Sequence, residues 1–314
     1  MGDAGHTLPY GVTLGRPQPL SIGVTANDEQ RTETFLDHRE LLFSIVYDML
    51  GSVADTEDVL QETWLAWTSR TGEAVSHPRA YLVRIAVNRA LSRRAAISRR
   101  REEYIGPWLP EPLVEPEGDP SERGESVSMA LMVVLETLTP LERVVFVLHE
   151  VFGYAHTEIA GILDRSPSAV RQLAHRAREH VQARRPRYRV DPRVRRQATE
   201  RFVAAMFGGD LEELLRLLAP DVTLWADGGG KAPAAGPRPL HGADRVARLL
   251  IARAVAVLDV RYRQVNGEPS AVLFMGDSPF AVIVLDLTPD GERVRAVYAI
   301  TNPDKLSQVD RTMS

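Results

Sequence analysis

Residues 155–181, AHTEIAGILDRSPSAVRQLAHRAREHV, constrain the fold more than any other stretch of the chain. Ile159 and Ile162 recur at helical spacing, so the first part is expected to form a helix with one buried face. Ser166 offers an N-cap hydroxyl and Pro167 suits the first position of a helix, so a second helix should begin there. The pattern predicts two helices joined by a turn of four residues, which indicates a helix-turn-helix.

The second expected helix has a polar face opposite its buried stripe. In a DNA-binding helix-turn-helix this helix lies in the major groove, with side chains on base edges and on phosphates. Ordinary helical hairpins with short turns are also common, so a solvated polar face is the alternative. The candidates for base contacts are Ser168, Arg171, Gln172 and His175, and those for phosphate contacts are Arg176 and Arg178.

Composition narrows the class of protein. At 314 residues the chain is too long for one typical domain, and a hydrophobic content of 44% is enough for folded cores. The absence of cysteine excludes disulfides, a thiol nucleophile and cysteine-bound metal, and suits a reducing compartment. Neither a membrane span nor a signal peptide is indicated. We therefore expect a multidomain cytoplasmic protein, with residues 1–29, rich in Gly, Pro and Thr, as a disordered extension.

Two expected helices in the first third of the chain carry opposite charge. The first of them is acidic and begins near residue 55, after a helical pattern from about residue 33. An acidic first turn suits the helix dipole by itself, which is the alternative for Asp55 and Glu57. Spacing of i, i+3 and i+4 places three further side chains on one face. They are Asp58, Gln61 and Glu62.

The other helix should begin at Pro78, after a polar loop over residues 68–77. From Arg84 to Arg101 the sequence has seven arginines and no acidic residue. This density indicates a polyanionic partner, since arginine neutralises phosphates in nucleic-acid binding. A merely solvated face would interleave glutamates, and the first of these is Glu102.

These segments together resemble a known family. DTEDVLQETW, PRAYLVRIAVNRALSRR and LTPLERVVFVLHEVFGYAHTEIAGIL, in this order, are similar to regions two and four of bacterial RNA polymerase sigma factors. The lack of a region three between them resembles the extracytoplasmic-function group. The resemblance implies two all-α domains, a region-two helical bundle over residues 30–101 and a region-four helix-turn-helix domain over residues 128–186. It implies core RNA polymerase and promoter DNA as partners.

The resemblance also implies roles for side chains. Asp58, Gln61 and Glu62 would contact the clamp of the polymerase, and the loop before the third helix would take a flipped base of the minus-ten element. The side chains expected on the melted strand are Arg84, Asn88 and Arg93. The helix-turn-helix would bind the minus-thirty-five element. One departure from the family is Ala155 in place of a capping Ser, which costs about 1 kcal/mol and leaves the assignment intact.

Residues 102–127 form a linker by composition, because prolines and acidic residues dominate them. The linker also contains YIGPWLPEPL over residues 104–113, and Tyr104, Trp108 and Leu109 are too apolar for a passive tether. A proline-stiffened apolar segment loses little entropy on binding, which favours docking onto another surface. Packing on a neighbouring helix is the alternative.

The chain from residue 190 onward changes from helical to alternating patterns. Helices are expected from Pro192 and Asp210, and turns at Asn266-Gly267 and Asp290-Gly291 separate some of the strands. Helices followed by an antiparallel sheet indicate an α+β domain, over residues 190–307 with a tail at 308–314. GDLEELLRLLAPDVTLWADGGGK and LHGADRVARLL resemble the SnoaL-like branch of the NTF2-like fold, a curved sheet around a cone-shaped pocket. The expected strands are 222–226, 258–265, 271–275, 280–287 and 294–301.

Some proteins with that fold are enzymes that use a pocket Asp, often with His. The candidates here are Asp227, Lys231 and His241, but no partner that would tune a catalytic pKa is evident. His241 lies in a turn, where a structural use is more usual, and the glycines 228–230 lack the Walker spacing. We expect no enzyme, metal or cofactor. A pocket that binds or turns over a small molecule is the alternative.

Three motifs favour regulation within the chain. WLPEPL, DGGGK and NPDKL match the motif set of extracytoplasmic-function sigma factors with a fused SnoaL-like extension, the group called ECF41. In that family the extension modulates the sigma factor in place of a separate anti-sigma protein. A tethered domain has a high effective concentration, so a weak contact can gate activity. The interdomain residues implied are Trp108, Leu109, Pro110, Asp227, Gly228, Gly229, Gly230, Lys231, Asn302, Pro303, Asp304, Lys305 and Leu306.

Overall fold

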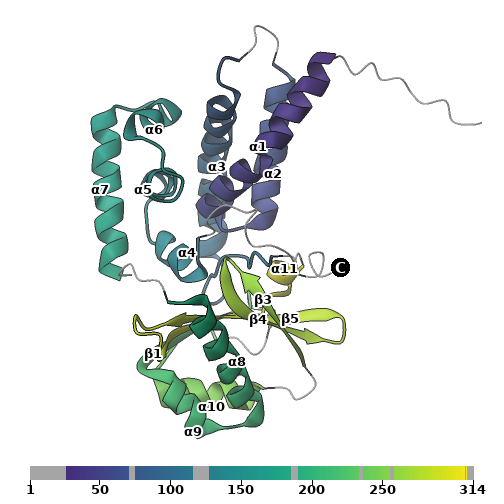
Figure 1. Cartoon of the computed structure of the whole chain (residues 1–314), viewed down its shortest axis with the longest axis vertical. Helices are drawn as coiled ribbons and strands as arrows, with labels where there is room; N and C mark the ends of the chain where they lie inside the picture. The colour runs from purple at the N-terminus through teal and green to yellow at the C-terminus, as the bar shows by residue number, and fades with distance from the viewer. Residues whose placement is uncertain are drawn as a thin grey trace, which may run out of the picture.

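The computed structural model shows two all-α units above a C-terminal α+β domain (Figure 1). No helix among the residues it describes is long and apolar enough to cross a bilayer. The expectations for residues 1–25 and for most of the tail lie outside the described residues. The residues that the structure describes are 26–70, 75–115, 127–184, 190–232, 236–254, 258–307 and 309.

The first bundle consists of α1 (Ala26–Leu50), α2 (Val53–Thr68) and α3 (Pro78–Glu102). Helix α1 begins before the expected boundary at residue 30; its first turn, ANDE, has no large apolar residue, so the sequence pattern does not indicate it. Ser52 caps α2 by accepting a hydrogen bond from the Asp55 N–H at 3.2 Å. Pro78 opens α3, as predicted.

The helix-turn-helix bundle follows the linker. Helices α6 (His156–Leu163) and α7 (Pro167–Arg184) form the expected pair, and their turn is one residue shorter than predicted because Asp164 adopts a left-handed conformation with φ of 52°. The Ser166 hydroxyl accepts from the Ala169 N–H at 3.2 Å, which is the predicted cap. The preceding elements are α4 (Met129–Leu135), α5 (Pro140–Phe146) and the π-helix η2 (Val147–Val151).

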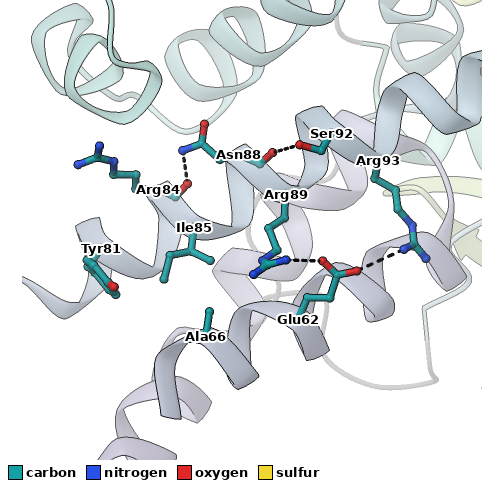
Figure 2. Close-up of a pocket in the computed structure, with 9 residues that line it drawn as sticks. All are labelled: Glu62, Ala66, Tyr81, Arg84, Ile85, Asn88, Arg89, Ser92 and Arg93. Atoms are coloured by element: carbon teal, nitrogen blue, oxygen red, sulfur yellow. Dashed lines mark hydrogen bonds and ion pairs between the residues drawn. The ribbon is translucent and has the colours of Figure 1, made fainter. Parts of the chain in front are cut away.

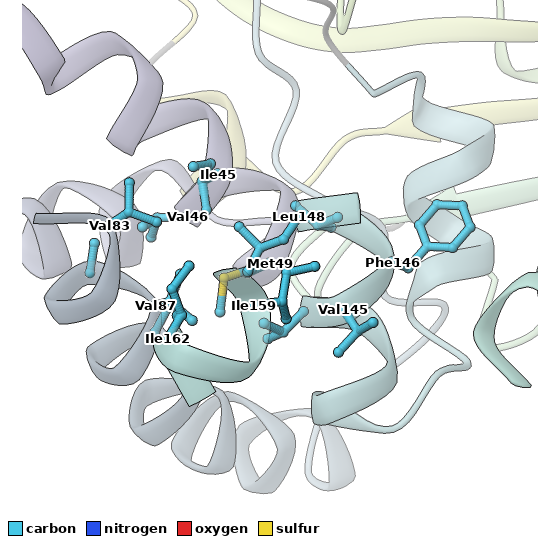
Figure 3. Close-up of a cluster of buried hydrophobic side chains, with 14 of the residues drawn as sticks. Ile45, Val46, Met49, Val83, Val87, Val145, Phe146, Leu148, Ile159 and Ile162 are labelled. Atoms are coloured by element: carbon cyan, nitrogen blue, oxygen red, sulfur yellow. The ribbon is translucent and has the colours of Figure 1, made fainter. Parts of the chain in front are cut away.

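One hydrophobic core runs through both bundles (Figure 3). Met49 of α1 and Val87 of α3 belong to the same buried cluster as Leu148 of η2 and Ile159 and Ile162 of α6. The sequence pattern does not indicate this contact. Each bundle also buries apolar side chains within itself, and the pattern cannot distinguish those from the side chains that face the other bundle. In this structure the two units therefore pack directly against each other through buried side chains.

The C-terminal domain has the predicted α+β fold. Its sheet has the order β2-β1-β6-β5-β4-β3, and most neighbours are antiparallel, as expected. The pair of β1 and β6 is parallel, so the expectation of an all-antiparallel sheet was wrong. The chain changes direction an even number of times between these two strands, and they therefore run the same way. The elements are α8 (Pro192–Gly208), α9 (Leu211–Leu217), β1 (Leu218–Asp227), β2 (Leu240–His241), α10 (Ala243–Arg253), β3 (Asp259–Val265), β4 (Glu268–Met275), β5 (Ser278–Leu287), β6 (Val294–Ile300) and α11 (Pro303–Leu306).

Both faces of this sheet are buried. Ile283 and Leu285 of β5 face the core formed with α8, α9 and α10, whereas Val282 and Val284 belong to a second core. The second core also contains Leu109 and Val114 of the linker and Met129 and Ala130 of α4. Strands that are covered on both faces are mostly apolar, as β5 is from Phe280 to Leu285. The linker and α4 thus complete the C-terminal domain.

Candidate nucleic-acid and interdomain sites

A groove of about 710 Å³ lies between α2 and α3 (Figure 2). Its lining combines apolar and aromatic side chains with arginines, a combination that suits single-stranded nucleic acid because bases stack and phosphates pair with guanidinium groups. All three residues expected on the melted strand line it. The lining residues are Glu62, Ala66, Tyr81, Arg84, Ile85, Asn88, Arg89, Ser92 and Arg93.

The arginines of α3 pair with acidic side chains of α2. Arg93 donates to Asp55 at 3.0 Å and also to Asp58 and Glu62, and Arg89 donates to Glu62 at 2.9 Å. The acid-free arginine run of α3 therefore has its counter-charges on the neighbouring helix, where a sequence pattern along one helix cannot show them. Asp55, which we attributed to the helix dipole, makes a largely buried ion pair.

The two remaining residues expected on the melted strand differ in their surroundings. Arg84 is exposed at the groove. Asn88 donates its side-chain amide to the Ile162 carbonyl of α6 at 3.3 Å. The end of the first helix of the helix-turn-helix thus contacts the groove. Of the expected clamp contacts, Gln61 is exposed beside Asp58, while Glu62 is shared with the arginines.

Helix α7 presents one exposed polar face. Arg178 does not share it, because it is half-buried and donates to Glu150 at 2.6 Å. Ala155 cannot cap α6 with a hydroxyl, as the sequence indicates, but its N–H still donates to the Glu158 carboxylate at 2.7 Å. The predicted DNA contacts that do lie on the exposed face are Ser168, Arg171, Gln172, His175 and Arg176.

A buried ion cluster joins the two bundles. Glu136, with a side chain 10% exposed, accepts from Arg94 and Arg101 of α3 and from Arg143 of α5, the last at 2.5 Å. Arg143 has a side chain 0% exposed and also donates to the Asp48 carbonyl of α1 at 2.8 Å. Burial would raise the pKa of Glu136, but the three guanidinium groups outweigh it and hold this pKa at about 2.

This depressed pKa predicts how acid destabilises the joined bundles. The carboxylate stabilises the fold above its ordinary pKa of 4.5, and this stabilisation is lost as the pH falls toward 2. The difference corresponds to about 3 kcal/mol of unfolding free energy. We expect Glu136→Gln to lower stability at pH 6 in urea unfolding and to show a flatter loss between pH 5 and 3 than the natural chain. Glu158→Gln, at an exposed helix end, is the control; equal slopes for all three proteins would contradict the prediction.

Asp227 is the centre of the interdomain network. Its side chain is 0% exposed and accepts from the Tyr104 hydroxyl, from the Leu109 N–H at 2.8 Å and from Lys305 Nζ at 2.7 Å. Lys305 also donates to the Leu109 carbonyl, and Asn302 donates to the Tyr104 hydroxyl at 2.7 Å. The linker motif, the end of β1 and the start of α11 therefore meet at one carboxylate.

Aromatic rings of the linker cover this network. The Tyr104 and Trp108 rings meet edge to face with centroids 4.6 Å apart, and Lys305 Nζ lies 3.8 Å from the centroid of Trp108. Arg101 of α3 lies 4.9 Å from the same ring. Burial lowers the pKa of Lys305, although Asp227 opposes this, and burial and Asp227 raise the pKa of Tyr104. Tyr104, which we noted only as apolar, is thus a hydrogen-bond donor of the site.

The glycines of DGGGK allow a close approach. Gly229 and Gly230 have φ of 59° and 71°, and a side chain at Gly229 would overlap Asn302. Lys231 forms an exposed ion pair with Asp304. The other motif residues lie within or beside the same junction, and they are Pro110, Gly228, Pro303 and Leu306.

A second contact joins the linker to the β3–β4 turn. The Asn266 N–H donates to the Leu113 carbonyl at 2.9 Å, and the Glu115 N–H donates to Gln264 at 2.9 Å. The Asn266 side chain donates to the Tyr47 hydroxyl of α1 at 2.8 Å. The turn was predicted, but Asn266 serves as a contact to the first bundle as well, and nothing in a local turn pattern could have shown this.

The structure does not assemble the enzyme candidates. Asp227 is buried and fully engaged, and Lys231 points to a surface partner. His241 is exposed at the end of β2 and lies 3.0 Å from the Thr223 hydroxyl. The described residues contain no group of three or more side chains suited to a metal ion.

Known proteins resemble this chain both in sequence and in fold. Residues 34–101 match the family described as Sigma-70 region 2, and residues 128–181 match Sigma-70, region 4. The ECF RNA polymerase sigma factor SigJ of Mycobacterium tuberculosis (H37Rv) is 37% identical over 290 residues, which cover 86% of this chain and 91% of the relative. The probable ECF RNA polymerase sigma factor SigI of the same strain is 30% identical over 275 residues, covering 86% and 92%.

The crystal structure of Mycobacterium tuberculosis SigJ extends the similarity to three dimensions. It superposes with a TM-score of 0.70 at 35% identity and covers 87% of this chain and 97% of that one. The match includes the C-terminal part, so the fold prediction, two all-α sigma domains and a SnoaL-like domain, is confirmed. Both matched families are regions of sigma factors, and neither describes an enzyme.

Proposed function

The chain belongs to the extracytoplasmic-function RNA polymerase sigma factors, and we propose that its C-terminal SnoaL-like domain controls promoter recognition by holding the chain in a closed form. Sigma factors bind core RNA polymerase and promoter DNA. In this proposal the groove between α2 and α3 takes the minus-ten strand, and the exposed face of α7 takes the minus-thirty-five element. We place the protein in the cytoplasm, with the polymerase.

Geometry supports a closed form. Promoter elements at minus ten and minus thirty-five are separated by about 25 base pairs, or roughly 85 Å at about 3.4 Å per base pair. Here α6 contacts α3 through Asn88 and Ile162, and the bundles share one core. We infer that bundles held together in this way must separate before both promoter elements are bound.

The buried carboxylate of Asp227 carries the regulatory part of the proposal. It holds the linker between the bundles through Tyr104 and Leu109, and the second core holds α4 through Met129 and Ala130. A domain that grips both the linker and the start of the helix-turn-helix bundle restricts their separation. Because the grip is intramolecular, its effective concentration is high and contacts of moderate strength suffice.

The pairing of α2 with α3 supports an order of events. Asp58 and Glu62 neutralise Arg93 in the closed form. A basic surface of the polymerase clamp would compete for these carboxylates and so release Arg93 toward the promoter strand. Polymerase binding would thereby prepare the minus-ten surface.

In vitro transcription tests the proposal. Promoters are first selected from a random library with core polymerase and the full chain. We expect Arg171→Ala to lower transcription from them about tenfold, the value of one good base contact, while core binding is retained. Asp58→Ala should instead weaken core binding in a pull-down.

Arg248→Ala, at an exposed position of the C-terminal domain, is the matched control and should leave both measurements unchanged. Failure of the natural chain to bind core polymerase would overturn the proposal and favour a repressor with the same DNA-binding helix. The small-molecule alternative for the C-terminal domain gains no support from the similar proteins.

A further inference from the structure

Glu111 of the linker binds the start of α2. Its carboxylate accepts from the Val53 N–H at 2.6 Å, from the Ala54 N–H at 3.4 Å and from the Ser52 hydroxyl at 3.0 Å. Its own N–H donates to the Gly51 carbonyl at 2.9 Å. The first N–H groups of a helix have no partner within it, so an acceptor placed there stabilises the helix end. This acceptor comes from a segment about 60 residues away in the sequence.

The same short segment also holds the C-terminal domain. Leu109, two positions before Glu111, bonds to Asp227 and Lys305, and Leu113, two positions after it, bonds to Asn266. Leu109 and Leu113 make these bonds with backbone N–H and carbonyl groups, whereas Glu111 reaches α2 with its side-chain carboxylate. Residues 109–113 thus contact the C-terminal domain at both ends and the start of α2 at the centre.

Prolines make this segment stiff. Pro110 and Pro112 flank Glu111, and each fixes its own φ and restricts the residue before it. These restrictions reduce the freedom of Leu109 and Leu113 to leave their sites while Glu111 stays in place. Tyr47 adds a direct link, because its hydroxyl donates to the Glu111 carbonyl at 2.6 Å and accepts from Asn266.

We infer that Glu111 is a positioning residue through which docking of the C-terminal domain controls α2, the helix that carries the expected polymerase contacts. The inference rests on the proposed function. When the C-terminal domain is docked, Glu111 holds α2 to the linker and the closed form. When it leaves, the stiff segment withdraws Glu111, and α2 becomes free to move with the first bundle.

The acceptor oxygens of Glu111, rather than its charge, make the contact. Burial raises the pKa of this carboxyl, while the bonds to Val53 and Ser52 oppose the rise. A neutral amide of the same length offers an acceptor at the same place. Glu111→Gln should therefore preserve the contact, and Glu111→Ala should remove it.

The experiment measures opening and transcription in the full chain. Because the chain has no cysteine, Leu36→Cys in α1 and Met275→Cys at the end of β4, at side chains 58% and 48% exposed, give two specific sites for spin labels. We expect Glu111→Ala to raise the open fraction and run-off transcription about tenfold, as the loss of a hydrogen-bonded carboxylate implies. Glu111→Gln should stay close to the natural chain. Glu103→Ala, an exposed linker glutamate, is the matched control.

A second variant chain distinguishes coupling between the C-terminal domain and α2 from a purely local stabilisation of α2. In a chain that also carries Asp227→Ala, the C-terminal domain is already released, so Glu111→Ala should add nothing to either measurement. If Glu111 only stabilised α2, its loss would weaken core binding in both backgrounds, and this result would overturn the inference. Unchanged label distances in Glu111→Ala would do the same. If no form transcribes, the proposed function fails, but the label distances still decide whether Glu111 couples the domains.

Discussion

Asp227→Ala should open the chain and raise transcription with core polymerase at least tenfold. The substitution leaves Lys305, 5% exposed, without its carboxylate, and it removes the acceptor for Tyr104 and for the Leu109 N–H. Breaking a buried ion pair on one side costs about 3–5 kcal/mol, which corresponds to a shift of more than about a hundredfold between closed and open forms. Run-off transcription and the distance between labels on α1 and β4 measure the effect.

Two controls make this result specific. Asp304→Ala breaks an ion pair of the neighbouring motif whose carboxylate is 64% exposed, and surface pairs contribute only about 0–1 kcal/mol, so little change is expected. The double variant Asp227→Asn with Lys305→Met removes both charges at once. It should close the chain better than Asp227→Ala does, because no buried charge is left unpaired. A rise in transcription for Asp304→Ala equal to that for Asp227→Ala would contradict the assignment.

A disulfide between the linker and β3 should have the opposite effect. Val114 and Val265 are partners in an antiparallel bridge, and the flanking bonds, Glu115 N–H to Gln264 and Asn266 N–H to Leu113, identify a non-hydrogen-bonded pair. In such pairs the Cα atoms lie about 4.5 Å apart, within the range that disulfides span. We expect oxidised Val114→Cys/Val265→Cys to lose at least about tenfold in run-off transcription, since a short tether keeps the linker at its site.

Reduction should restore the activity of this variant. The natural chain has no cysteine, so the two introduced thiols can form one intramolecular bridge, and each single variant controls for the substitution itself. Full transcription from the oxidised double variant would show that the linker need not leave β3, and the closed form would then not be inhibitory.

Local patterns predicted the elements well. The helix-turn-helix was evident from Ser166, Pro167 and the apolar spacing, because capping and periodicity are encoded within a few residues. The β3–β4 turn at Asn266-Gly267 was evident for the same reason. The sequence motifs also placed Asp227 among the interdomain residues, though only through resemblance to a family.

Contacts between distant segments could not be predicted in this way. Glu136 appears as one acidic residue beside α4, and nothing near it indicates that three arginines surround it. Glu111 lies in a proline-rich segment whose local pattern indicates a linker, yet its partners are the N–H groups of α2. Such roles depend on which surfaces meet, and a single sequence contains no direct record of that.

The pairing of α2 with α3 also determines how the protein responds to ionic strength. Bare arginines that neutralise phosphates release condensed cations from DNA, and the affinity then falls steeply as salt is added, in proportion to their number. In this chain Arg89 and Arg93 already pair with carboxylates of α2, and they would have to leave them to bind DNA phosphates. The net electrostatic free energy of DNA binding is therefore smaller than for unpaired arginines. We expect the same carboxylates to weaken nonspecific DNA binding by the free protein, because they lower the net positive charge of the α3 surface.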